Sequence, residues 1–394
     1  MEMAARAPGF SASACSDDYA LPRWPVARDE LWAQLASKPY VKGVREQGRF
    51  ALWWLRGHPN YTGTQWGIRA TPSSRGLSLM DINAADGVLV EPACEKKDII
   101  RGETFLPGFP YLQKEWIYNA KYEVWAANVC SLYEEGVERQ WSATRDIPWA
   151  KQERLPDDLE SAMCQFCTFL TGGELQAEDV LAKFIPLVNQ YYHEPKLFLA
   201  LQCLDEARHL EVFRKRCLSN GGGIGVAPPV LFNTTSLIDM AGDFTTASYA
   251  IHLVFEGIFL QVFRAGEFIG QTEVDKAIFR RVMQDEARHV SYGTMHLKFY
   301  LENHPDRTQA EEHLHAIADG TELIFLNNFF TTPDIIEPLA VLFGGGVRHV
   351  DTGLERLRIW WRQVREDYLR RCDRAGFNRR ERCLFPEDHF FFMA

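Results

Sequence analysis

Asp205-Glu-Ala-Arg-His209 decides the fold of this chain, because the same five residues return as Asp285-Glu-Ala-Arg-His289. A Glu and a His three residues apart lie on one face of a helix, about one turn along its axis, so both side chains can reach one metal ion. One copy alone would be equally typical of a salt-bridged helix surface. Two identical copies are not expected by chance, and they predict two helices that together bind two metal ions.

Each repeat is preceded by a glutamate that interrupts an apolar helical stripe, Glu174 in the first half and Glu256 in the second. A carboxylate on such a face must be paired, protonated or bound to metal, because burying it bare costs several kcal/mol. Glu174 precedes Glu206 by 32 residues, and Glu256 precedes Glu286 by 30. In antiparallel hairpins with short loops, this spacing brings all four carboxylates to one level of a helix bundle.

Two further side chains compete for this site. Glu178 lies one helical turn after Glu174, and its spacing to Glu206 departs from that of the second half by the same amount. The Gly-Glu step and the Phe-Leu pair before it favour Glu174. His252 lies one turn before Glu256, and we expect either a ligand or base near the site or a core histidine held by hydrogen bonds.

The helical period of apolar residues predicts helices over residues 111–145, 157–192, 195–219, 245–269, 272–304, 310–329 and 354–375. A further helix is expected over residues 28–55, with a possible break at Lys38-Pro39. Gly172-Gly173 predict a local distortion or a close backbone approach. We assign residues 1–110 to an N-terminal extension packed on the main body, 111–304 to the di-metal helical bundle, and 305–394 to C-terminal helices of the same domain.

Composition indicates an ordinary soluble protein. With 394 residues, 46% of them apolar, the chain has ample material for a core. No stretch approaches the roughly 20 uninterrupted apolar residues of a membrane helix, and residues 1–18 lack the pattern of a secretory signal. Nine cysteines are too few for a disulfide scaffold, so we expect reduced thiols and a cytoplasmic location. The net charge of −10 argues against nucleic acid as a partner.

Four segments carry a resemblance to a known family: Phe169-Leu-Thr-Gly-Gly-Glu174, Phe255-Glu-Gly-Ile-Phe259 and the two repeats. They resemble the ferritin-like di-iron carboxylate oxygenases, in which two single Glu residues and two Glu-x-x-His pairs point into one bundle. The hydroxylase subunits of bacterial multicomponent monooxygenases, p-aminobenzoate N-oxygenase and the ribonucleotide reductase small subunit are the most similar. The resemblance covers about residues 160–300 and implies an all-α fold, a ferritin-like four-helix bundle with extra N- and C-terminal helices.

The resemblance implies that two iron ions are bound by six catalytic side chains, with one or more Glu bridging: Glu174, Glu206 and His209 at one ion, and Glu256, Glu286 and His289 at the other. It also implies that Asp205 and Asp285 accept the second imidazole N–H across the bundle and are held by Arg208 and Arg288. Four carboxylates balance two divalent ions, and oxygen and imidazole ligands suit iron, or manganese at one position.

The implied function is activation of O2 to hydroxylate or N-oxygenate a small organic substrate, in specialised metabolism. An external reductase or ferredoxin would supply electrons, because no flavin or iron–sulfur motif is visible, and we expect a homodimer. Three alternatives stay open. They are a desaturase or oxidase on the same site, a Mn/Fe ligand-binding oxidase, and a non-catalytic metal-binding subunit of an oxygenase complex.

Departures from the family pattern narrow this interpretation. Phe213 stands where the ribonucleotide reductase small subunit has its radical Tyr, which disfavours a tyrosyl-radical generator. Leu260 stands where hydrocarbon hydroxylases often have a Thr, and Val282 stands where p-aminobenzoate N-oxygenase adds a third His. Apolar neighbours of the ligands, such as Phe259 and Phe263, are either pocket walls or simple core.

Overall fold

The computed structural model describes residues 10–11, 27–48, 50, 70–84, 90–94, 99–103, 113–227, 241–329 and 333–388. Its chain divides into two compact units. The first comprises Met1–Asn119 with Asn189–His193, and the second comprises Ala120–Val188 with Glu194–Ala394. The predicted packing of residues 1–110 on the main body and the boundaries at 111–304 and 305–394 stay predictions.

The described part of the first unit contains short elements: strands β1 (Phe10–Ser11) and β2 (Gln113–Lys114), paired antiparallel, and helices α1 (Arg28–Ser37), α2 (Pro39–Gln47) and α4 (Leu79–Asn83). Lys38 has an extended ψ of 137° and separates α1 from α2, because a following proline disfavours the helical conformation. The predicted break at Lys38-Pro39 is therefore confirmed. Residues 51–55 of that predicted helix lie outside the described residues.

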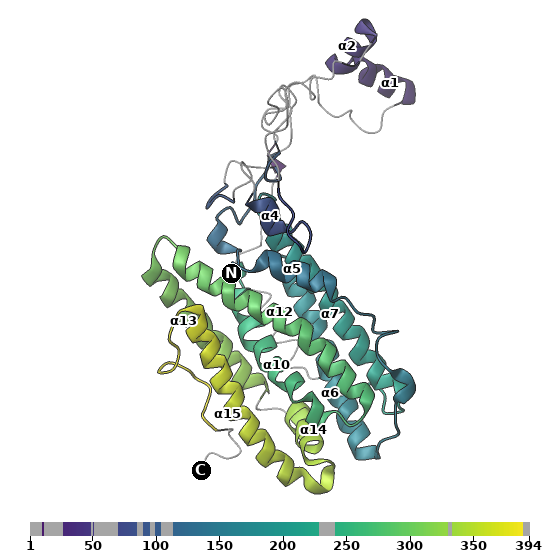
Figure 1. The fold of residues 1–394 in the computed structure, drawn as a ribbon, viewed down its shortest axis with the longest axis vertical. Coiled ribbons are helices and arrows are strands. Elements are labelled where there is room, and N and C mark those ends of the chain that lie inside the picture. Colours follow the sequence, from purple (N-terminus) through teal and green to yellow (C-terminus); the bar gives the residue numbers. More distant parts are fainter. Residues whose placement is uncertain are drawn as a thin grey trace. The chain divides into compact units, whose positions relative to one another are not determined.

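A four-helix bundle forms the centre of the second unit (Figure 1): α6 (Asp157–Ala182), α7 (His193–Ser219), α10 (Glu256–Arg264) and α12 (Glu273–Asn303). Thr272 and Asp275 form a capping box at the start of α12. The bundle buries one apolar core that includes Phe166, Phe213 and Phe279. The predicted all-α, ferritin-like four-helix bundle with further helices before and after it is confirmed.

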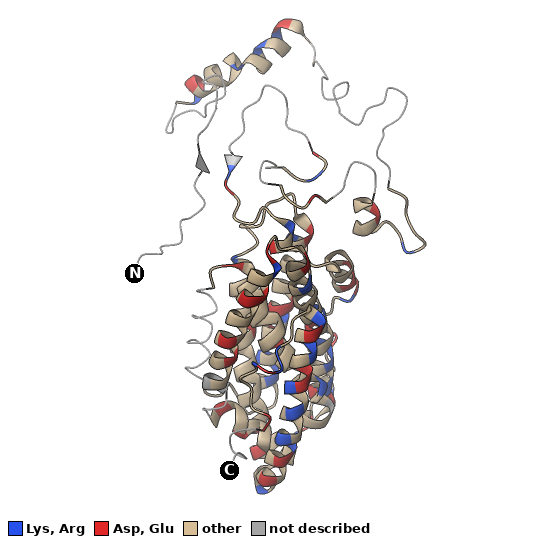
Figure 2. Cartoon of the chain, turned by 90° about the vertical axis from the view of Figure 1, so that its left-hand side faces the viewer, with Lys and Arg blue, Asp and Glu red and all other residues tan. Residues whose placement is uncertain are grey.

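Outer helices complete the second unit: α5 (Val129–Glu138), α9 (Phe244–Ser248), α11 (Gly266–Ile269), α13 (Arg307–Phe329), α14 (Pro333–Gly344) and α15 (Val350–Ala375), with 3-10 turns at Lys121–Glu123, Trp149–Lys151 and Val347–His349. The helical period did not predict α14, which packs on α6 and α15. Figure 2 shows acidic and basic residues interspersed along the helices of this unit.

The predicted helix over residues 111–145 is wrong except at its centre, where α5 forms. Local side chain to backbone hydrogen bonds replace the helical ones before α5. The Asn119 amide donates to Trp116 O at 2.8 Å, and the Glu123 carboxylate accepts from Ala120 N at 3.0 Å. The predicted distortion at Gly172-Gly173 is wrong, because α6 is continuous there. A Cβ added at Gly173 would meet no atom within 4 Å, and the alternative of a close backbone approach at Gly172 stays a prediction.

The predicted helix over residues 245–269 is interrupted by a π-helix, Tyr249–Phe255, between α9 and α10. The backbone N–H of Glu256 donates to Ile251 O, five residues back instead of four. A π-turn inserts one extra residue and so rotates the residues that follow it, and such turns are frequent at functional sites. Glu256 is the first residue after this turn, so the turn decides which way its carboxylate points.

Neighbouring helices hold the π-helix from two sides. On α12, a Cβ added at Gly293 would lie 2.2 Å from His252 Cβ, so the two backbones approach closely. On α15, Arg371 donates from Nη2 to Leu253 O at 3.2 Å, and its guanidinium lies against Gly257. The turn is therefore supported by contacts that no single helix supplies.

The described residues contain one helical stretch, Phe244–Arg264, whose length and composition would allow it to cross a membrane. Of the most apolar 18 residues of this stretch, 78% are buried inside the protein, as is typical of a core helix. The same stretch carries Glu256 into the bundle. The expected absence of a membrane span stays a prediction.

Replacing Gly293 by Ala should destabilise the metal-free protein by about 1–3 kcal/mol, because the new methyl group would overlap His252. Gly173→Ala is the matched control, since that position is helical and open, and it should stabilise by roughly 0.5–1 kcal/mol. Urea unfolding followed by circular dichroism measures both. Equal stability of the two variants would contradict the close approach of α12 to the π-helix.

Candidate metal centre

Four helices bring six predicted side chains together: Glu174 on α6, Glu206 and His209 on α7, Glu256 at the start of α10, and Glu286 and His289 on α12. All six are buried. Glu174 and Glu256 are 7% and 6% exposed, whereas the other four are exposed by 2% or less. The single glutamates therefore lie on the more open side of the cluster.

Ligand atoms of the six side chains form two groups, each within 4.8 Å. One group is Glu174, Glu206, His209 and Glu286, and the other is Glu206, Glu256 and His289. Glu206 belongs to both groups, as expected of a bridging carboxylate. Glu286 differs from its expected place, because it joins the first group. Its Oε1 lies 3.3 Å from His209 Nδ1, and its Oε2 lies 3.6 Å from His289 Nδ1, so it faces both groups.

Several atoms in the cluster have no hydrogen-bond partner, although they are fully buried: Nδ1 of His209 and of His289, and Oε2 of Glu206, Glu256 and Glu286. Each such atom costs about 1–3 kcal/mol if nothing else binds it. Both histidines use Nε2 to contact an Asp carboxylate, so Nδ1 of each ring faces the glutamates. Unpaired nitrogen and oxygen donors that converge in this way fit two divalent ions such as iron or manganese.

Charges in the cluster show the same need for cations. Burial raises the pKa of Glu174 and of Glu256 well above the usual carboxyl range. Burial opposes ionisation of Glu206 as well, but His289 and His209 lower its pKa well below that range. Burial also tends to lower the pKa of His209, yet its carboxylate partners raise it well above the usual value. The metal-free cluster is therefore short of positive charge.

Each histidine contacts the Asp of the other repeat. His209 Nε2 lies 3.2 Å from Asp285 Oδ2, and His289 Nε2 lies 3.3 Å from Asp205 Oδ2. Because a carboxylate only accepts, these contacts place the imidazole protons on Nε2 and orient both rings.

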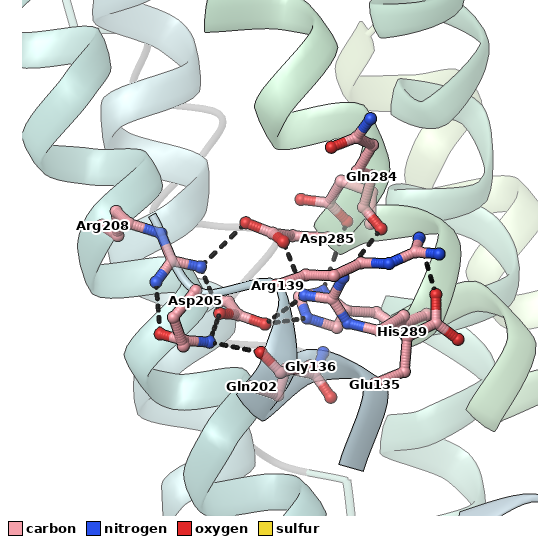
Figure 3. A network of polar contacts seen from close by, with 12 residues as sticks. Glu135, Gly136, Arg139, Gln202, Asp205, Arg208, Gln284, Asp285 and His289 are labelled. Atoms are coloured by element: carbon pink, nitrogen blue, oxygen red, sulfur yellow. Dashed lines mark hydrogen bonds and ion pairs between the residues drawn. The ribbon is translucent and has the colours of Figure 1, made fainter. Parts of the chain in front are cut away.

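Two arginines, Arg208 and Arg288, connect these carboxylates. Figure 3 shows Arg208 next to Asp205 and Asp285. Arg208 donates to Asp285 at 2.8 Å and also to Asp205, and Arg288 donates to Asp285 at 2.5 Å and to Asp205 at 3.1 Å. Burial alone would raise the pKa of Asp285, but His209 and the two arginines lower it far below the usual range. Both Asp residues therefore accept as full carboxylates.

Sequence reasoning missed the residues that α5 and the following loop add to this network. Trp141 Nε1 donates to Asp285 Oδ2 at 2.7 Å across 144 residues of chain, and Gln140 accepts from Arg208 at 2.7 Å. A Cβ added at Gly136 would lie 3.1 Å from Arg288 Nε. The repeats themselves contain no signal for these contacts.

The two other candidate ligands, His252 and Glu178, lie outside both ligand groups among the described residues. His252 is fully buried, and both of its nitrogens have partners, Ser248 Oγ at 2.8 Å and Gln202 Oε1 at 3.1 Å. It is therefore a hydrogen-bonded core histidine next to the site. Glu178 is half-buried and belongs to neither ligand group among the described residues.

Aromatic rings pack together on one side of the ligands. Phe169 lies 5.4 Å from Phe259, and Phe213 stacks on Phe263 at 6.0 Å between ring centroids. Phe213 is fully buried, so the position of the expected radical Tyr is filled by core packing.

His296, the second buried histidine of α12, should make the stability of the protein depend on pH. Burial lowers its pKa to about 4. A lowered histidine pKa contributes stability above the unfolded value of about 6.5, and this contribution is lost as the pH falls towards 4. Between pH 7 and 4, wild type should lose roughly 3 kcal/mol of stability relative to His296→Gln. Urea unfolding of both metal-free proteins at each pH measures the difference, and parallel curves would contradict the burial of a neutral imidazole.

The network makes a second prediction, because Asp285 orients His209. Asp285→Asn removes the carboxylate that requires the Nε2–H tautomer, so metal affinity should fall by about 10–100-fold, as for other outer partners of metal-binding histidines. The exposed Asp179 on α6 provides the control Asp179→Asn, which should leave affinity unchanged. Titration with Mn2+ and detection of the free ion by electron paramagnetic resonance measures both, and equal affinities would exclude the orienting role.

No family model and no curated protein matches this chain. Solved structures similar to it include an R2-like ligand-binding oxidase with aerobically reconstituted Mn/Fe cofactor, at 17% identity over 64% of this chain and 93% of that one, with a TM-score of 0.47. A point variant of an R2-like ligand-binding oxidase gives 17% identity, 62% and 92% coverage and a TM-score of 0.49. At these values the likeness does not decide a function, which depends on the site itself.

Proposed function

We propose that this protein is a non-haem di-iron oxygenase that uses O2 to hydroxylate or N-oxygenate a small organic substrate. The observation that carries this proposal is the pair of buried ligand groups that share Glu206, with unpartnered Nδ1 atoms on His209 and His289. Two ferrous ions bound there would supply the electrons and the Lewis acidity that O2 activation requires.

The protein's own groups would prepare this reaction. Glu206 would hold both ions, while His209 and His289 would each bind through Nδ1 and keep the Nε2 proton on an Asp carboxylate. Glu174 and Glu256, on the more open side, would be the ligands nearest to an incoming molecule. Burial of the cluster excludes water, which strengthens each electrostatic contact.

The aromatic residues near the ligands support the proposal of a small organic substrate. The rings of Phe169, Phe213, Phe259 and Phe263 would form an apolar wall for a small organic substrate. An external reductase or ferredoxin would supply the electrons that return the two ions to the ferrous state. We also propose a cytoplasmic homodimer. Manganese at one of the two positions is compatible with these ligands.

Glu206→Ala tests the proposal, because Glu206 belongs to both ligand groups. Wild type from iron-supplemented cells should contain about two irons per chain, and its ferrous form should develop a transient visible absorption band after mixing with O2; the variant should lose both. Glu178→Ala is the matched control, since Glu178 is a nearby carboxylate outside the groups, and it should behave as wild type. Absence of metal from wild type would overturn the proposal.

Isotope labelling separates the reaction types once a substrate is found. Under 18O2, an oxygenase places label in the product, whereas a desaturase or oxidase on the same site does not. Metal analysis of the same protein distinguishes Fe/Fe from Mn/Fe. A loaded centre that never reacts with O2 would instead favour the non-catalytic subunit.

A further inference from the structure

A chain of three buried side chains leads away from Glu256. Gln202 donates from Nε2 to Glu256 Oε1 at 2.8 Å, with Glu206 Oε1 at 3.4 Å. Gln202 Oε1 lies 3.1 Å from His252 Nε2, and His252 Nδ1 lies 2.8 Å from Ser248 Oγ. Gln202, His252 and Ser248 are all fully buried, so water does not compete for these contacts.

When Glu256 is ionised, as it would be as a metal ligand, each hydrogen bond from Glu256 to Ser248 has one possible direction. A ligand carboxylate accepts, so the Gln202 amide must present its NH2 to Glu256 and its carbonyl oxygen to His252. His252 Nε2 must then carry a proton, and Nδ1 of the neutral ring accepts from the Ser248 hydroxyl. Burial lowers the pKa of His252 to about 3, which keeps the ring neutral. Reversing the amide would place two oxygen atoms against each other.

The hydrogen bonds that run from Glu256 through Gln202 and His252 to Ser248 break the symmetry between the two halves of the site. The repeats agree at each ligand and at each Asp and Arg, with a register of 80 residues. In that register Gln202 corresponds to Val282, and both are fully buried. His252, four residues before Glu256, corresponds to Leu170, four residues before Glu174. A polar pair therefore supports Glu256, whereas the corresponding positions in the other half, Val282 and Leu170, are apolar.

We propose that Gln202, oriented by His252, is a positioning residue that holds Glu256 for the second metal position and makes the two positions unequal. The inference rests on the proposed function. The contact to Glu256 Oε1, which also lies 3.8 Å from His289 Nδ1, limits the rotation of the carboxylate and leaves Oε2 without a hydrogen-bond partner. For Glu174 the described neighbour is His209 Nδ1 at 3.7 Å, and no neutral donor within the described residues restrains it in the same way.

The π-helix and Gly293 make this contact possible. His252 lies within the π-helix, and its Cβ occupies the space that a side chain at position 293 would need. The backbones of α12 and the π-helix must therefore approach closely for the imidazole to reach Gln202 on α7. Tyr292 packs edge-on against the ring, 5.6 Å between centroids, and limits its rotation.

Mn2+ titration of the full chain, with free Mn2+ measured by electron paramagnetic resonance, tests the inference. Gln202→Met keeps the length of the side chain but removes the donor, and His252→Met removes the group that orients it. Each should weaken one of the two ions by about tenfold, the low end for outer partners of metal ligands, and leave the other within about twofold. His252→Gln retains a donor near the Nε2 position and should restore most of the lost affinity.

His296→Met is the matched control for the loss of a buried histidine. His296 is also fully buried and bonded to a hydroxyl, that of Thr245 at 3.1 Å, but its other nitrogen contacts Trp125 O. This variant should lose stability without a change in either Mn2+ affinity. Equal losses in His252→Met and His296→Met would show a structural role only and overturn the inference.

Double variants identify the metal position. With Glu256→Gln, which disables the second group, adding Gln202→Met should leave the remaining ion unchanged. With Glu174→Gln, the same addition should still weaken the ion at the second group. The opposite pattern, or two bound ions in wild type with unchanged affinities in Gln202→Met, would overturn this inference and leave the proposed function intact. Wild type without bound metal would overturn both.

Discussion

Four carboxylates and two imidazoles meet inside one apolar bundle, and the need to balance their charge governs the rest of the structure. Burial and, to a smaller extent, the neighbouring carboxylates raise the pKa of Glu174 and Glu256, while the two histidines lower the pKa of Glu206. Unpartnered donors that converge on a shared space are expensive unless cations bind there. Without bound cations these groups would lower the stability of the fold, and for the same reason they would bind two divalent ions strongly.

Around this centre, the protein builds an outer network that is nearly symmetric and an inner support that is not. Asp205 and Asp285 exchange partners across the bundle, so each repeat orients the histidine of the other. Gln202 and His252 have apolar counterparts, Val282 and Leu170, at the corresponding positions of the other half. The π-helix carries His252 toward Gln202 on α7. The symmetric Asp–His contacts orient the histidine ligands of both repeats. The Gln202–Glu256 contact, which has no counterpart at Glu174 among the described residues, would make the two metal positions unequal.

Helices outside the bundle also shape the site. Arg371 on α15 donates a hydrogen bond to the π-helix, and Trp141 in the loop after α5 donates one to Asp285. A close approach at Gly293 completes the support of the π-helix. These contacts join segments that are far apart in the chain, so the geometry of Glu256 depends on the folded protein as a whole.

The sequence by itself determined the bundle, its long helices and the six side chains that meet, because helical period and spacing act within one element or one hairpin. It also left Glu178 and His252 as rivals and predicted a helix over residues 111–145, where local side chain to backbone bonds prevail. Only the tertiary structure decided that Glu286 faces both histidines, that a π-turn directs Glu256, and that Gln202 holds it. These features arise from packing between helices, which no periodic pattern along one helix encodes.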